Sequence, residues 1–115
     1  ITDSHMGGTY DISQILALSS NVGSAKLIVK SYSSNPQIFI NHLRRWKMFD
    51  KLDIELPGAA KPMIVTPESK RWNKATLASM SYGYASAFSL LQLATFYNGI
   101  ANDGKMVKPL FIKAR

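Results

Sequence analysis

The chain has 115 residues and is 46% hydrophobic, so it can bury one core but is too short for two ordinary domains. It contains no cysteine, which excludes a disulfide framework, a thiolate metal site and a thiol nucleophile. The formal net charge of +7 favours attraction to acidic polymers or surfaces. The basic residues are scattered and no basic run exceeds two residues, so we expect no nucleic-acid partner.

Membrane and metal signals are weak in this sequence. No apolar run approaches the roughly 20 residues of a membrane-spanning helix, and the amino terminus lacks the regions of a secretory signal. The two histidines, His5 and His42, are too far apart in sequence to indicate a zinc site, which needs three or four ligands at matched spacing. We therefore expect the chain itself to be soluble, with no metal and no cofactor.

The first half of the chain is predicted to be helical. Asp11 and Gln14 form a capping box in front of a helix over about 12–19, whose apolar residues are spaced for one face. Apolar spacing also predicts a helix over about 22–32. An asparagine followed by proline predicts the start of a third helix, over about 36–47.

The second half is more irregular. Prolines and glycine punctuate a long loop, in which residues 54–56 are the best candidate for a short strand. A short helix is expected over about 76–80, and a capped helix over about 90–102. Partial alternation predicts a strand over about 105–113, with a proline that implies an edge or a break. The predicted class is therefore α+β, mainly helical, with residues 1–115 belonging to one domain.

The sequence Ser-Ser-Asn occurs twice, at residues 19–21 and 33–35. The second triplet runs into Pro36 and is explained as a linker and helix cap. The first lies between two predicted helices without proline or glycine. Such a corner can hold the side chains of Ser19 and Asn21 on the same side, although serine and asparagine are also ordinary capping residues, so spacing alone favours a helix junction.

The string LALSSNVGSAKL, residues 16–27, resembles the S-x-N region of the penicillin-binding transpeptidases. Further segments follow in the order seen in class B, cell-division-type members, and most resemble those of the Bacteroidetes lineage: residues 3–8, 54–58, 72–77, 81–84 and 89–109. This resemblance implies an internal portion of a transpeptidase domain with the penicillin-binding and serine β-lactamase-like fold.

The resemblance also implies an activity. In the family, the serine of an S-x-x-K motif is acylated by the D-alanyl-D-alanine end of a peptidoglycan stem peptide, or by a β-lactam. Ser19 would join the proton-transfer network with the S-x-x-K lysine, and Asn21 would hold the substrate amide, whereas Ser20 has no implied role. The parent protein would work with cell-division proteins, anchored in the inner membrane with this part in the periplasm.

Two of the family's three motifs are missing from these residues. No serine or threonine has a lysine three positions later, and there is no K-S-G or K-T-G. The chain alone is therefore expected to be inactive. Two smaller departures, Leu90 where proline is usual and Ala85 where glycine is common, are expected to be tolerated.

Two alternatives to catalysis stay open. The first is a non-catalytic helical interaction module that binds peptidoglycan or a cell-division partner, and the second, less favoured, is a basic nucleic-acid binder. Under both the catalytic and the interaction hypothesis, the apolar side chains that would pack against parts of the fold outside these residues must be buried by another surface. We therefore expect the isolated chain to self-associate through some of the following residues: Leu93, Phe96, Tyr97, Val107, Leu110 and Phe111.

Overall fold

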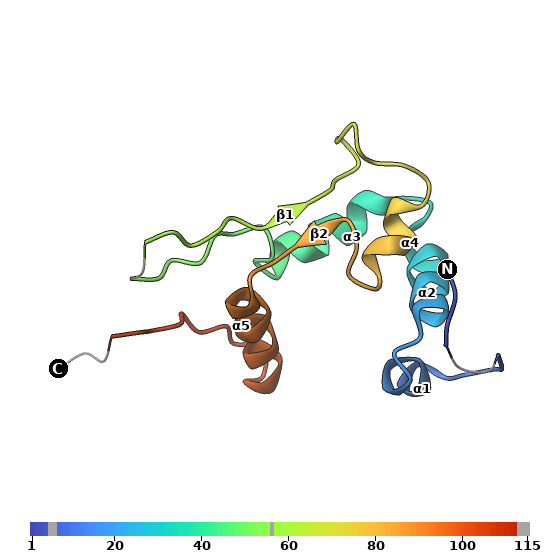
Figure 1. Ribbon diagram of the computed structural model, residues 1–115, viewed down its shortest axis with the longest axis horizontal. Helices are drawn as coiled ribbons and strands as arrows, with labels where there is room; N and C mark the ends of the chain where they lie inside the picture. The colour runs from blue at the N-terminus through green and yellow to red at the C-terminus, as the bar shows by residue number, and fades with distance from the viewer. Residues whose placement is uncertain (5–6, 56, 113–115) are drawn as a thin grey trace. The chain divides into compact units, whose positions relative to one another are not determined.

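The computed structural model describes residues 1–4, 7–55 and 57–112, and this part of the chain contains five α-helices and one two-stranded sheet (Figure 1). It divides into two compact units, one built from Ile1–Phe39 with Val65–Ala85, the other from Ile40–Ile64 with Ser86–Arg115. No helix in the described ranges combines the length and apolar character needed to cross a membrane.

The first unit is organised around α2 (Asn21–Tyr32), which packs against α1 (Ile12–Ala17) and α4 (Thr76–Met80). Its buried apolar side chains come from α2, α4 and the extended segment before α4: Ala25, Ile28, Val65, Leu77 and Met80. The apolar face predicted for the first helix is only partly covered, because Ile12 and Leu16 are 70% and 81% exposed whereas Ile15 is half-buried. That face therefore contributes only Ile15 to the packing of α1 on α2.

The second unit contains most of α3 (Pro36–Arg45) and all of α5 (Leu90–Ala101). Within it, the Ile40 side chain is fully buried, and the ring of Trp46, just beyond α3, lies 5.9 Å from that of Phe96 in α5. Gln92 closes the capping box with Ser89 and also donates to the backbone oxygen of Asp50 at 3.1 Å. One buried amide therefore caps α5 and ties it to the loop after α3.

The strands differ from those predicted. β1 (Met63–Ile64) pairs with β2 (Ser86–Ala87) in antiparallel register, Met63 opposite Ala87. The strand expected at residues 54–56 is absent over 54–55, and Leu56 lies outside the described residues. The loop strand forms later in the sequence because its partner, β2, lies opposite residues 63–64.

The strand predicted over about 105–113 was wrong for residues 105–112, and Lys113 lies outside the described residues. In the described part of the chain no strand pairs with this segment, and Pro109 has no amide hydrogen for a ladder. It is held instead by side chains of the loop before β1. The Lys108 ammonium donates to Asp53 at 2.8 Å, and the Phe111 amide donates to Glu55 at 3.3 Å.

The ion pair between Lys108 and Asp53 shifts both groups toward their charged forms. The hydrogen bond from Lys108 lowers the pKa of Asp53, and the same bond raises the pKa of Lys108. Both side chains are exposed to water, Lys108 over 50% and Asp53 over 91% of its surface. Solvent screens such a pair, so the contact orients the segment without adding much to stability.

Ala85 adopts a backbone conformation that favours glycine. Its φ is +58°, in the left-handed region, where a side chain costs about 1–2 kcal/mol. Its carbonyl oxygen accepts a hydrogen bond from the Val65 amide at 2.9 Å, which ties this conformation to the unit's core segment. Alanine is therefore accommodated with strain.

Replacing Ala85 by glycine should relieve that strain. Because glycine also gains entropy in the unfolded chain, we expect a net gain of only about 0.5–1 kcal/mol in unfolding free energy. Urea unfolding at fixed protein concentration measures it. The control is Ala87→Gly, in the exposed edge of β2, which should lower stability. Equal losses for both variants would contradict the assignment of strain to Ala85.

Candidate functional site

The first Ser-Ser-Asn triplet forms the corner between α1 and α2. Ser19 has φ +52°, in the left-handed region, and its amide donates to the Leu16 carbonyl at 3.0 Å. Ser20 is extended and serves as the N-cap of α2, and Asn21 is the first residue of that helix. The left-handed turn ends α1 at Ala17, before the predicted end of this helix at residue 19.

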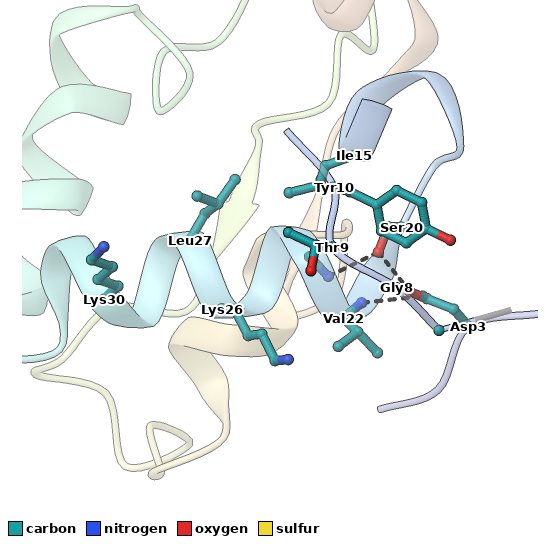
Figure 2. A pocket seen from close by; sticks show the side chains of 12 residues that line it. Asp3, Gly8, Thr9, Tyr10, Ile15, Ser20, Val22, Lys26, Leu27 and Lys30 are labelled. Carbon is teal, nitrogen blue, oxygen red and sulfur yellow. Dashed lines mark hydrogen bonds between the residues drawn. The ribbon is translucent and has the colours of Figure 1, made fainter. Parts of the chain in front are cut away.

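Ser20, for which no role was expected, is the best-connected residue of the corner. Its side chain is buried, with only 3% of the residue exposed. Its hydroxyl donates to Asp3 Oδ2 at 2.5 Å and accepts from the Gly23 amide at 2.9 Å. Asp3 Oδ1 accepts from the Val22 amide at 3.1 Å, as Figure 2 shows. Serine is an ordinary capping residue, but the helix was predicted to begin at about residue 22, so neither Ser20 as the cap nor its bond to Asp3 was predicted.

Ser19 and Asn21, the two residues predicted to act on the substrate, are both exposed. Neither side chain hydrogen-bonds to another residue in the part of the chain that is described. A hydroxyl and a primary amide can each donate and accept without titrating near neutral pH. The corner therefore presents two neutral polar groups to solvent on either side of a buried serine.

The helices approach each other closely at Gly23, in the first turn of α2. A Cβ added there would lie 2.8 Å from Ile15 Cγ1 and 2.9 Å from Ser20 Oγ. Both distances are shorter than real Cβ contacts, so a side chain at this position would displace the Ile15 side chain or the Ser20 hydroxyl. A residue without a side chain is thus required for the corner to close.

A groove of about 540 Å³ runs beside the corner, between the amino-terminal segment, α1 and α2. Thr9 and Tyr10 of the amino-terminal segment and Lys26 of α2 are among the residues that line it (Figure 2). Ser19 and Asn21 do not line this groove. Among the described residues no three histidine, aspartate or glutamate side chains gather to hold a metal ion.

The family model for the penicillin binding protein transpeptidase domain matches residues 1–115. The chain belongs to this family. The resemblance noted in the sequence is therefore confirmed at the level of the family, over all of the printed residues.

Relatives of this transpeptidase-domain chain are found in several bacteria. Penicillin-binding protein PbpB of Mycobacterium tuberculosis is 31% identical over 91% of the chain and 15% of its own length. The probable peptidoglycan D,D-transpeptidase PenA of Neisseria flavescens is 31% identical over 98% of the chain and 27% of its own length. The probable peptidoglycan D,D-transpeptidase FtsI of Caulobacter vibrioides is 31% identical over 87% of the chain and 16% of its own length. The chain thus spans about a quarter or less of these relatives.

A solved structure supports the same fold. The crystal structure of a peptidoglycan glycosyltransferase from Burkholderia ambifaria superposes with a TM-score of 0.83 at 31% identity, covering 100% of this chain and 35% of that one. The predicted α+β class of the transpeptidase fold is therefore confirmed. The individual roles predicted for Ser19 and Asn21 are not tested by this likeness.

Proposed function

We propose that this chain is part of a D,D-transpeptidase that cross-links peptidoglycan and is acylated by β-lactams. The observation that carries the proposal is the Ser19–Asn21 corner, which presents a hydroxyl and an amide in a chain that matches the transpeptidase family over residues 1–115. The names of its relatives PenA and FtsI as probable peptidoglycan D,D-transpeptidases support the substrate class.

Ser19 and Asn21 have different proposed roles. The Ser19 hydroxyl can pass a proton between the lysine of an S-x-x-K motif and the leaving group, because it both donates and accepts. The Asn21 amide can pair with both the N–H and the C=O of a substrate peptide bond. Their exposure and their lack of partners among the described residues leave both groups available for these contacts.

The nucleophile belongs elsewhere in the proposed enzyme. The 115 residues contain no S-x-x-K and no K-[ST]-G, so the acylated serine and the third motif must come from outside them. We further propose a parent protein that is held by a membrane helix in the inner membrane, carries this part in the periplasm and works with cell-division proteins. This setting rests on the resemblance of the sequence to class B, cell-division-type members of the family.

Acylation by a fluorescent penicillin tests the function. The complete protein that carries this chain should form a covalent adduct that survives denaturing electrophoresis and appears in the intact mass. The 115-residue chain alone should form none, because covalent catalysis requires an activated nucleophile beside a base.

Two outcomes would contradict these expectations. A stoichiometric adduct on Ser19 in the chain alone would make that serine the nucleophile and overturn its assigned role. A complete protein that takes no label, and whose sequence lacks S-x-x-K and K-[ST]-G, would favour the non-catalytic interaction module.

A further inference from the structure

We propose that Asp3 is a positioning residue that fixes the corner presenting Ser19 and Asn21 to the substrate. This inference rests on the proposed transpeptidase function and adds to it a residue outside the S-x-N motif. Asp3 does not need to touch the substrate in this proposal. It acts through the residues on either side of Asn21, which it holds with one carboxylate.

The geometry of that carboxylate carries the inference. One oxygen accepts from the Ser20 hydroxyl at 2.5 Å, and the other accepts from the Val22 amide at 3.1 Å (Figure 2). Ser20 and Val22 are the residues immediately before and after Asn21. The two bonds therefore fix the backbone on both sides of the asparagine, and the same contact fixes the residue that directly follows Ser19.

The Ser20 hydroxyl is confined from two directions. It donates to Asp3 and at the same time accepts from the Gly23 amide at 2.9 Å, so its hydrogen and one lone pair are both committed. A Cβ on residue 23 would stand 2.9 Å from this oxygen, so glycine at this position leaves the Ser20 hydroxyl undisturbed in its place between the two partners. With 3% of Ser20 exposed, water is not an alternative partner for the hydroxyl.

An N-cap by itself does not require this arrangement. Ser20 alone accepts from Gly23 and would cap α2, as Ser89 caps α5 with no aspartate partner of this kind in the described part of the chain. Asp3 adds a tie across 17 residues of sequence. Hydrogen bonds to an ionised carboxylate are roughly twice as strong as neutral ones, and a negative charge is favoured at the amino end of a 12-residue helix.

The strained turn explains why a tie is needed. Ser19 has φ +52°, which a residue with a Cβ seldom adopts. If the corner relaxed, Ser19 would return to the α or β region and its hydroxyl would move away from its present direction. A displacement of about 1 Å at such a group is enough to slow a reaction by roughly 10²-fold.

The test uses the complete protein and separates binding from chemistry. Stopped-flow mixing with a fluorescent penicillin, well below the melting temperature, gives the dissociation constant of the first complex and the acylation rate constant. We expect Asp3→Ala to lower the rate constant by roughly 10- to 100-fold, with a smaller rise in the dissociation constant because Asn21 contacts the substrate. Asp3→Asn keeps an acceptor for Val22 and should fall between wild type and alanine.

Two controls distinguish positioning from stability. Asp11→Asn removes a comparable capping carboxylate from α1 and should leave acylation unchanged. In backgrounds that already carry Ser19→Ala or Asn21→Ala, the effect of Asp3→Ala should shrink, because residues that act as a unit are not additive. If Asp3→Ala does not fold, the same comparisons are made with Asp3→Asn and Ser20→Ala.

The outcomes are separable. The positioning role would be overturned, with the proposed function intact, if folded Asp3 variants acylated at the wild-type rate. It would also be overturned if the effect of Asp3→Ala on the rate constant were the same in the Ser19→Ala and Asn21→Ala backgrounds as in the wild type. A wild-type protein that is not acylated would overturn both. If Asp3→Ala lowers the acylation rate constant, and this effect disappears in the Ser19→Ala or Asn21→Ala background, the positioning role and the proposed function are both supported.

Discussion

Replacing Ser19 by alanine in the complete protein should slow acylation by a penicillin by roughly 10²-fold or more. The expected loss is that of one acid–base contribution in the transition state. Stability should change by no more than about 0.5 kcal/mol, because the Ser19 side chain is exposed and has no hydrogen-bonding partner among the described residues. Acylation rates and thermal melting of the same variant measure the two effects separately.

Ser33→Ala is the matched control for this prediction. Ser33 opens the second Ser-Ser-Asn triplet, is also exposed and lies at the carboxyl end of α2 as its C-cap. Its known contact is made by the backbone amide, which alanine retains. This variant should acylate at the wild-type rate. Equal rates for Ser19→Ala and Ser33→Ala would return the first triplet to an ordinary helix junction.

The isolated 115-residue chain should self-associate through the apolar face of α5. Spacings of three and four residues place four exposed side chains along one stripe of this helix: Leu90, Leu93, Tyr97 and Ile100, which are 85%, 36%, 67% and 61% exposed. The segment after the helix adds Val107 and Phe111, both at least half exposed. Phe96, also expected on this surface, is partly covered by Trp46.

The magnitude of the effect follows from the size of these side chains. Burying one large apolar side chain contributes about 1.5–3 kcal/mol, so several together are comparable with the stability of a small domain. In the solved relative, the part that matches this chain makes up 35% of the protein, so the rest of that protein is available to cover such a surface. In the isolated chain we expect a second copy to cover it. Strand pairing by residues 105–112 is not expected, since they form no strand.

Sedimentation equilibrium over a wide concentration range measures this association. Tyr97→Lys, in the middle of the stripe, should shift the equilibrium strongly toward monomer. Leu16→Lys is the control, because Leu16 is 81% exposed and belongs to a different helix, α1. A strictly monomeric wild-type chain with sharp, cooperative unfolding would contradict the prediction and would show that the chain has a self-sufficient core.

Local signals in the sequence determined most of the helical structure. The capping boxes of Asp11 with Gln14 and of Ser89 with Gln92 are present as predicted, because each is completed within three residues of chain. The short helix at Thr76–Met80 has the bounds that were expected. The family, and with it Ser19 and Asn21 as candidate residues, also followed from the order of motifs along the chain.

Contacts between distant residues were decided only by the tertiary structure. The bond from Ser20 to Asp3 crosses 17 residues and that from Gln92 to Asp50 crosses 42, so no local pattern marks either pair. The same holds for β1 and β2, two-residue strands that exist because they face each other. The alternating segment at 105–112, by contrast, found no strand partner among the described residues, since a strand's backbone groups must be satisfied by another segment. Helices satisfy theirs internally, which is why the sequence determined the helices and the fold determined the strands and the corner.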